Sequence, residues 1–135
     1  MSVQRAVRGA PAAARLRKWA RAAARPGAEV TLRVVGAAEA RRLNRAFRKR
    51  DYATNVLSFS YGPNHGDLVL CHPVIAREAR EWKKKLSAHY AHLVVHGMLH
   101  LRGRGHARRA QARRMERAEI AVLRRLGFGD PYALK

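Results

Sequence analysis

The spacing of apolar and polar positions predicts strands mixed with helices in the first part of the chain, and helices alone after it. Residues 29–35 alternate between apolar and polar side chains and are rich in β-branched residues, which is typical of a strand with one buried face. Residues 54–60 and 67–71 are two further predicted strands, and the short turn-forming segment between them indicates an antiparallel hairpin. A short edge strand is also expected within residues 2–7.

Apolar positions three and four residues apart indicate amphipathic helices elsewhere in the chain. Four such segments cover residues 12–24, 37–47, 73–84 and 107–126. Helix 37–47 is expected to turn Phe47 inward and its arginines toward solvent. A fifth predicted helix, residues 88–102 with Ser87 as its N-cap, has little polar surface apart from its histidines, so we expect it to be central and buried.

These elements predict an α+β fold, in which a small mixed β-sheet packs against helices and the central buried helix carries the histidine motif. A chain of 135 residues is long enough for one domain, and we expect a single domain over residues 1–135. No apolar run reaches the length of a membrane span, and no signal peptide is visible. Together with a lone cysteine, Cys71, this favours a cytoplasmic protein without a membrane partner.

The net charge of +20 favours a polyanionic partner, most simply a nucleic acid, because basic side chains gain free energy when they displace counterions from phosphates. A compositional origin is the alternative, since the whole chain is rich in alanine and arginine. The charge does not distinguish RNA from DNA, and the sequence does not set the oligomeric state.

Three histidines lie in a pattern that suits a metal ion. His96 and His100 are four residues apart on one face of the predicted helix, Gly103 offers a turn that ends the helix, and His106 follows three residues later. Three imidazoles that meet at one point form the ligand set of a catalytic zinc ion with an open position. The same spacing occurs in metzincin proteases, but Gly97 replaces their general-base glutamate, which argues against a peptidase.

The remaining histidines leave an alternative open. His89 and His92 lie on the same helical stripe, so a ligand set that pairs His92 with His96 is geometrically possible. We prefer the set that includes His106, because the turn after the helix explains how a third ligand returns to the same face. His65 and His72 are expected in surface loops.

Several sequence blocks carry a family resemblance. They read L-N-R-A-F-R at 43–48, T-N-V-L-S-F at 54–59, G-D-L-V-L at 66–70 and A-H-L-V-V-H-G-M-L-H-L at 91–101. With the tail at 126–132, these blocks resemble the bacterial YbeY family of metal-dependent endoribonucleases. The resemblance covers about residues 29–132, and its histidine block is the most specific part.

The resemblance implies a zinc-dependent, single-strand-specific endoribonuclease that acts in ribosomal RNA maturation and ribosome quality control. It implies one zinc ion held by His96, His100 and His106, and as partners a ribosomal RNA precursor and the small ribosomal subunit. Arg48 matches the family's arginine, and a guanidinium can hold phosphate in a bidentate manner, so we expect a catalytic role for it. The alternative for Arg48 is an ordinary surface charge.

One departure from the family pattern bears on activity. The family has an aspartate before its third histidine, where this chain has Gly105. Two other functions therefore stay open. The first is a non-catalytic RNA-binding factor in ribosome assembly with a structural metal, and the second is a metal hydrolase of another class.

Overall fold

In the computed structural model, which describes residues 1–103 and 109–133, four strands form one mixed sheet in the order β1-β2-β4-β3. The strands are β1 (Ser2–Arg5), β2 (Glu29–Val35), β3 (Val56–Gly62) and β4 (His65–Cys71). Strand β2 pairs in parallel with both β1 and β4, while β3 and β4 form an antiparallel hairpin. The predicted α+β class, the hairpin and the N-terminal edge strand are confirmed.

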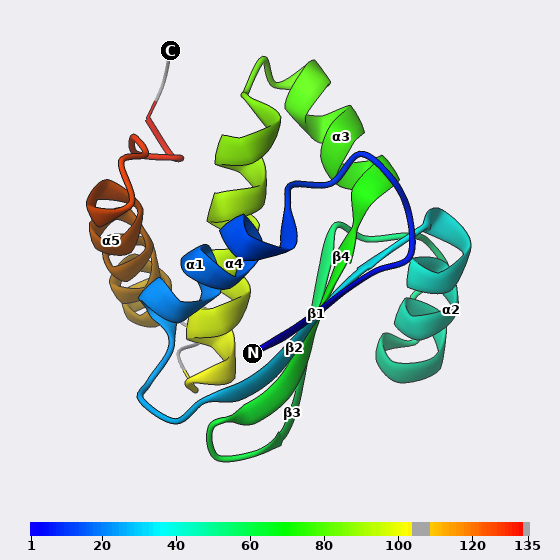
Figure 1. Ribbon diagram of the computed structural model, residues 1–135, viewed down its shortest axis with the longest axis horizontal. Coiled ribbons are helices and arrows are strands. Elements are labelled where there is room, and N and C mark those ends of the chain that lie inside the picture. The colour runs from blue at the N-terminus through cyan, green and yellow to red at the C-terminus, as the bar shows by residue number, and fades with distance from the viewer. Residues whose placement is uncertain (104–108, 134–135) are drawn as a thin grey trace.

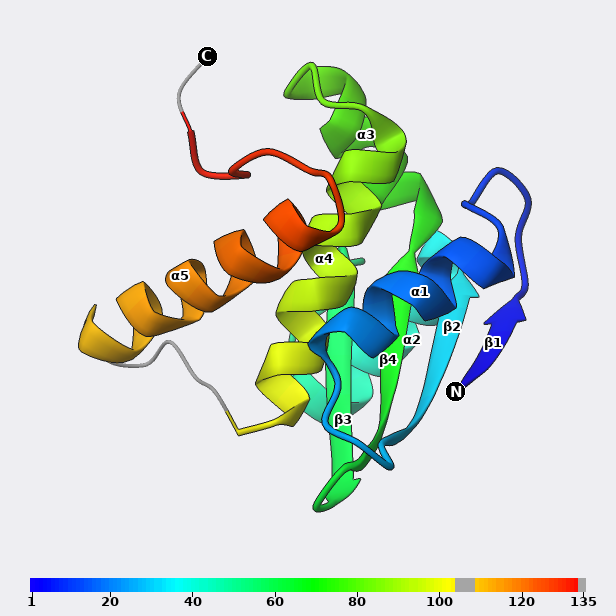
Figure 2. The same cartoon turned by 60° about the vertical axis from the view of Figure 1, so that its left-hand side comes forward.

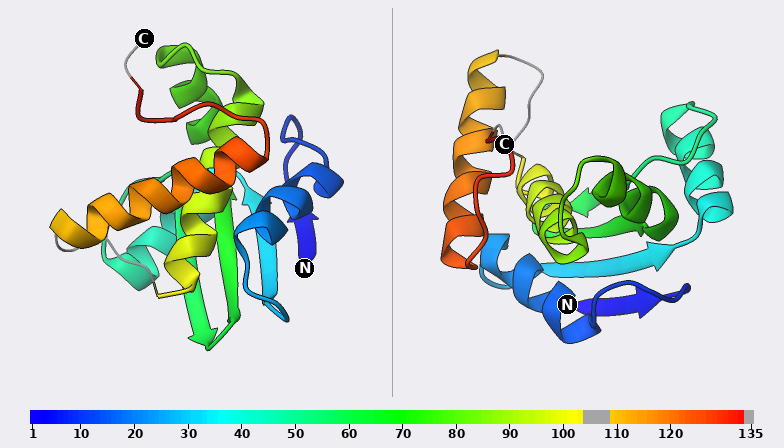
Figure 3. Two further views of the ribbon diagram at one scale, coloured as in Figure 1. Left: turned by 90° about the vertical axis from the view of Figure 1, so that its left-hand side faces the viewer. Right: turned by 90° about the horizontal axis from the view of Figure 1, so that it is seen from above.

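The described residues also form helices on both faces of this sheet. They are α1 (Ala13–Ala23), α2 (Ala37–Arg48), α3 (His72–Glu81), α4 (Leu86–Leu101) and α5 (Arg109–Arg125). Helix α2 lies on one side of the sheet, whereas α1 and α4 lie on the other (Figures 1 and 2). Helix α5 packs on α4 from outside, so α4 lies between α5 and the sheet (Figure 3).

The alternation along the strands divides the interior into two clusters. Leu32, Val34, Leu68 and Leu70 face α1 and α4 and belong to the main core. The neighbouring positions of the same strands face α2 and form a smaller cluster that includes Val35, Leu57, Val69 and Cys71. The larger cluster holds α4 firmly in place, and α4 carries the histidines.

Helix α4 is buried along most of its length, as predicted, and it approaches β4 closely at Gly97. A β-carbon at position 97 would lie 2.2 Å from Leu68 Cδ1, so only glycine fits without a shift. The helix begins at Leu86, and Lys85 is its N-cap without a side-chain hydrogen bond. The prediction that Ser87 caps it is therefore wrong by two residues.

Two aromatic side chains lie on the surface, and for Phe47 this contradicts the prediction that it points inward. Phe47, at the end of α2, is 61% exposed, and Trp82, just after α3, is 51% exposed. Helix α2 packs through Ala40 and Asn44, and Asn44 Nδ2 donates a hydrogen bond of 2.9 Å to the Tyr52 carbonyl. Phe47 follows on the same stripe near the end of α2, where its ring lies edge to face with Phe59 and the centroids are 5.3 Å apart. None of the helices in the described ranges is long and apolar enough to cross a lipid bilayer.

Candidate metal centre

Helix α4 presents a row of imidazoles along one side. His92, His96 and His100 follow at four-residue intervals, which places them on one face of the helix, one turn apart. The ring centroids are 6.3 Å apart for His92 and His96, and 5.7 Å apart for His96 and His100. His92 and His96 are half-buried, whereas His100 is exposed. The row therefore runs from the protein interior toward solvent.

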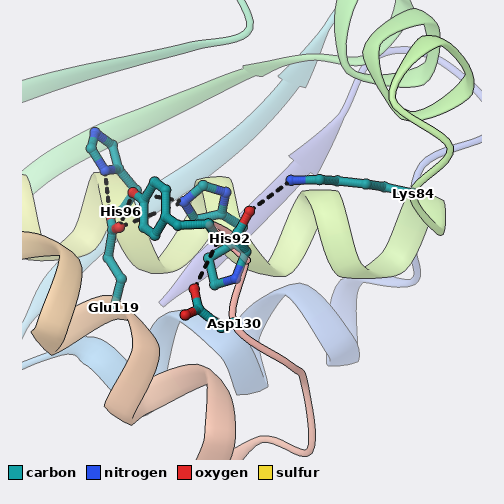
Figure 4. A network of polar contacts seen from close by, with 7 residues as sticks. Lys84, His92, His96, Glu119 and Asp130 are labelled. Carbon is teal, nitrogen blue, oxygen red and sulfur yellow. Dashed lines mark hydrogen bonds and ion pairs between the residues drawn. The ribbon is translucent and has the colours of Figure 1, made fainter. Parts of the chain in front are cut away.

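Glu119 of α5 lies against the buried end of this row. Its side chain is fully buried, and one carboxylate oxygen is hydrogen-bonded to His96 Nδ1 (Figure 4). The other oxygen, Oε2, is 3.6 Å from His92 Nε2. Glu119 thus connects α5 to two of the histidines of α4.

The chain beyond α5 adds a tyrosine to the same cluster. Tyr132 Oη donates a hydrogen bond to Glu119 Oε2 and lies 3.2 Å from His92 Nε2. This segment is held in place by Lys84 Nζ, which donates to the Pro131 carbonyl at 3.1 Å, and by Asp130, whose Oδ1 accepts from the Tyr132 amide at 2.8 Å (Figure 4). A residue far from α4 in the sequence therefore completes the polar surroundings of Glu119.

The hydrogen bonds around Glu119 fix its charge. Burial raises the pKa of the carboxyl group, but its contacts with His92, His96 and Tyr132 outweigh burial and hold the pKa at about 2. Burial and the contact with Glu119 raise the pKa of Tyr132, so its hydroxyl stays protonated. At neutral pH, Glu119 is a carboxylate and can only accept hydrogen bonds.

This charge also assigns the tautomer of His96. Since Glu119 can only accept, Nδ1 of His96 must carry the proton in their hydrogen bond. The neutral ring then has its lone pair on Nε2, on the side of the ring turned away from Glu119. A carboxylate that accepts from one imidazole nitrogen while the other binds metal is a common arrangement around histidine ligands. The donor set of this site therefore fits a metal ion.

His96 and His100 also line a hollow of about 210 Å³, and Glu119 is not part of its wall. Arg48 and Ser58 line the same hollow, from the end of α2 and from β3. Arg48 Nη2 donates a hydrogen bond of 2.7 Å to the Ser58 carbonyl, and its guanidinium lies 5.1 Å from the centre of the Phe59 ring. Two predicted metal ligands and the predicted phosphate-binding arginine thus meet at one place.

The third predicted ligand, His106, lies outside the described residues, as does Gly105. A second candidate group of metal ligands lies within the described residues. Nitrogen atoms of His92 and His96 and a carboxylate oxygen of Glu119 all lie within 4.8 Å of one another. Two imidazoles and a carboxylate also form a known zinc donor set. Both groups contain His96, but the first adds His100 and His106, whereas the second adds His92 and Glu119. Glu119 is thus a ligand in the second group and the partner that orients His96 in the first.

Sequence reasoning missed Glu119 and Tyr132. Glu119 had a signal, because it lies four residues after Met115 and three before Val122 on the apolar stripe of α5, and a carboxylate on a buried stripe needs partners. Tyr132 had no local signal in the residue pattern, since its role depends on how the chain returns after α5.

The other histidines have structural surroundings. His89 is buried, and its Nε2 lies 2.9 Å from Glu78 Oε1. His72 begins α3 half-buried, with Nδ1 2.7 Å from Tyr90 Oη, so its assignment to a surface loop is wrong. His65 is exposed, as expected, but it begins β4, because the hairpin turn is shorter than predicted.

Known proteins resemble this chain over most of its length. The family model described as Endoribonuclease YbeY matches residues 5–127. Proteins named Endoribonuclease YbeY from Azoarcus sp. (strain BH72) and Aromatoleum aromaticum are 52% and 53% identical, in each case over 98% of this chain. This chain spans 59% of the length of the first of these relatives and 92% of the second.

Two further matches agree with these. A protein of the same name from Bordetella pertussis is 60% identical over 78% of this chain and 71% of its own length. The solution structure of a Thermotoga maritima protein matches with a TM-score of 0.57 over 98% of this chain and 99% of that one. Its identity of 19% restricts that likeness to the fold.

Proposed function

The chain belongs to the Endoribonuclease YbeY family, and from that premise we propose that it is a zinc-dependent endoribonuclease specific for single-stranded RNA. We propose a ribosomal RNA precursor as substrate, the small ribosomal subunit as partner, and a role in ribosomal RNA maturation and quality control in the cytoplasm, performed by one domain over residues 1–135. The observation that carries the proposal is the hollow that Arg48, His96 and His100 share.

In this proposal one zinc ion is held by His96, His100 and His106. The support from the described residues is the hydrogen bond between His96 and Glu119, which leaves Nε2 of His96 as the nitrogen with a lone pair. Zinc bound by neutral imidazoles would supply Lewis acidity toward a phosphoryl oxygen and would lower the pKa of a coordinated water to about 7.

Arg48 holds the phosphate in this proposal. Its hydrogen bond to the Ser58 carbonyl and its contact with the Phe59 ring fix the guanidinium at the rim of the hollow. The remaining N–H groups of the guanidinium can bind the non-bridging oxygens of a phosphodiester, where negative charge increases during cleavage. The net charge of +20 attracts the RNA backbone to the protein surface.

A peptidase of the metzincin type fits the structure poorly. Those enzymes carry a general-base glutamate directly after the first histidine, where this chain has Gly97. Even a β-carbon at that position would overlap Leu68. The Leu68 side chain would have to shift before any side chain fitted at this position.

A second candidate is a non-catalytic RNA-binding factor with a structural metal. The observation that favours it is Gly105, at the position where the family has an aspartate. If that carboxylate is needed for proton transfer or for orienting a ligand, this chain binds metal and RNA without cutting the strand.

Cleavage by purified wild-type protein and by His100→Ala, with zinc content measured on both, tests the proposal. We expect wild type to carry zinc and to cut a labelled single-stranded RNA but not the same sequence in a duplex. We expect His100→Ala to lose both the zinc and the cleavage. Equal cleavage by a His100→Ala preparation that has lost its zinc would identify a contaminating nuclease. Equal cleavage with zinc retained would contradict a ligand role for His100, and zinc binding without products from wild type would favour the second candidate.

A further inference from the structure

A second hollow, of about 390 Å³, adjoins the first one at Arg48, which lines both. It lies on the α2 side of the sheet, and Phe47 of α2 and Phe59 and Tyr61 of β3 line it. We call this hollow, with Phe47, Phe59, Tyr61, Arg33 and Arg48 in its wall, the aromatic hollow. The first hollow is lined by Val56, Leu57 and Ser58 of β3 and by His96 and His100 of α4, so it reaches the α4 side of the same sheet edge.

The aromatic rings of this hollow are unusually exposed. Phe47 and Tyr61 are each 61% exposed, whereas Phe59 is half-buried against the smaller apolar cluster. Phe47 meets Phe59 edge to face, with the centroids 5.3 Å apart, and the Arg48 guanidinium lies over Phe59. Phe59 has a packing role in the fold. The exposed parts of the Phe47 and Tyr61 rings do not pack against the fold. Exposed aromatic patches of this kind mark binding surfaces.

Positive charge surrounds these rings. Arg33 and Arg48 line the hollow, and α2 with the turn after it adds further basic residues, namely Arg41, Arg42, Arg45, Lys49 and Arg50. Part of this charge is balanced, since Glu39 pairs with Arg33, Asp51 pairs with Arg41, and Asp67 in the wall accepts a hydrogen bond of 2.8 Å from Tyr61 Oη. The basic residues still outnumber these three carboxylates. Rings that stand among arginines suit a ligand that is both flat and anionic, which describes a nucleotide strand.

We propose that the aromatic hollow is a stacking subsite for unpaired bases of the RNA, whose backbone passes Arg48 on its way to the hollow of His96 and His100. This inference rests on the proposed function and adds how the substrate strand is held. Stacking a base on an aromatic ring contributes about 1–3 kcal/mol, and it tolerates any base because every base has a π face.

The path across the sheet edge is short enough for one strand. Arg48 lines both hollows, so a backbone that contacts its guanidinium reaches the wall of each. A base stacked on Phe47 or Tyr61 must be unpaired, so the subsite also gives a physical reason for a preference for single strands. A duplex would hold its bases inside the helix, away from the rings.

Binding of a fluorescein-labelled oligoadenylate in EDTA, followed by anisotropy, tests the subsite without cleavage. The variants are Phe47→Leu and Tyr61→Leu, which keep an apolar side chain and remove the ring. The matched control is Trp82→Leu, because Trp82 is 51% exposed and lies next to α3, outside both hollows. A second probe has the same backbone but lacks the bases.

We expect each ring variant to weaken oligoadenylate binding by about fivefold or more, and to leave binding of the abasic probe unchanged. The slope of log K against log salt should match that of wild type, because stacking neutralises no phosphate. Trp82→Leu should bind both probes like wild type.

Unchanged oligoadenylate binding by both ring variants would overturn the inference. An equal loss on both probes, or a shallower salt slope, would also overturn it, because the rings would then act only by positioning Arg48. Base-dependent binding by a wild-type protein that never cuts RNA would sink the proposed endoribonuclease and leave the stacking subsite intact.

Discussion

His96 Nδ1 and a carboxylate oxygen of Glu119, 23 positions apart in the sequence, form a hydrogen bond that ties α4 to α5. The carboxylate is fully buried and, with a pKa of about 2, carries a full negative charge at neutral pH. The bond therefore fixes which nitrogen of His96 is protonated and how the ring is oriented.

The first prediction concerns Glu119 as an orienting partner. We expect Glu119→Gln to weaken zinc binding by about 10-fold to 100-fold while one ion still binds, because the amide orients the ring without the charge. Competition with a chromophoric chelator measures the affinity. Glu116→Gln, an exposed change on the same helix, is the matched control and should bind zinc like wild type. Equal affinities for Glu119→Gln and wild type would contradict the orienting role.

The second prediction separates the two possible ligand groups. If His96, His100 and His106 hold the ion, His100→Ala loses stoichiometric zinc, whereas His92→Ala keeps it. If His92, His96 and Glu119 hold it instead, the outcomes are reversed. Zinc content after dialysis, measured by atomic emission on both variants, decides between the groups. We expect the first result.

The third prediction concerns the geometry at Arg48. Lysine keeps the charge but loses the planar fork, the contact over Phe59 and the bond to Ser58. We therefore expect Arg48→Lys to lower kcat for RNA cleavage by about 100-fold or more with a smaller change in KM. Arg45→Lys, an exposed change one turn earlier on α2, should cleave at the wild-type rate. An undiminished kcat in Arg48→Lys would mean that only charge matters at this position.

Much of the fold could be predicted because period-two and helical patterns are local signals. Strands β2, β3 and β4 and the buried helix α4 follow from runs such as Glu29–Val35, whose alternation reflects burial on one face of the sheet. The exposure of Phe47 could not be predicted in this way, since it depends on how far α2 extends past the smaller cluster. Residue preference also gives the wrong N-cap for α4. Serine is favoured at N-caps, but the helix begins at Leu86, before Ser87.

The site was only partly visible in the sequence. His96 and His100 follow from their spacing, and Arg48 from a resemblance in sequence, yet nothing local indicates that Arg48 reaches the same hollow as the two histidines. Glu119 and Tyr132 join the site through the packing of α5 and of the chain after it against α4. Contacts of this kind, between segments far apart in the sequence, leave no periodic pattern of apolar residues that could predict them.

The fourth prediction uses the close approach of α4 to β4. Alanine is a better helix former than glycine, yet we expect Gly97→Ala to destabilise the protein by about 1–3 kcal/mol, because its β-carbon overlaps Leu68. Urea unfolding in EDTA measures the change. The comparison variant is Gly129→Ala, where a β-carbon would have no atom within 4 Å, and its stability should match that of wild type. A more stable Gly97→Ala would show that the two elements separate easily.

The fifth prediction concerns acid stability. Burial lowers the pKa of His89 below its usual value of about 6.5, despite the opposing hydrogen bond with Glu78, and burial lowers the pKa of His72 as well. As the pH falls below about 6.5, the unfolded chain takes up protons at these residues while the folded protein does not. The free energy of unfolding should therefore decrease as the pH falls from about 7 to about 5.5.

Urea midpoints across this pH range, in EDTA, measure that decrease. His89→Gln removes one of the two groups and should show a smaller decrease than wild type. The exposed His65 provides a control, since His65→Gln should follow the wild-type curve. A wild-type midpoint that stays constant or rises on acidification would refute the prediction.

Strand β3 forms one edge of the sheet, and an open edge is a place where a second polypeptide can add itself as a further strand. The Arg48 guanidinium donates a hydrogen bond to the Ser58 carbonyl of this strand and so holds a positive charge beside the strand. Two molecules that approached each other edge to edge would bring these charges together and repel. Arg48, which we propose binds the substrate phosphate, would thus also disfavour self-association of the protein into extended sheets.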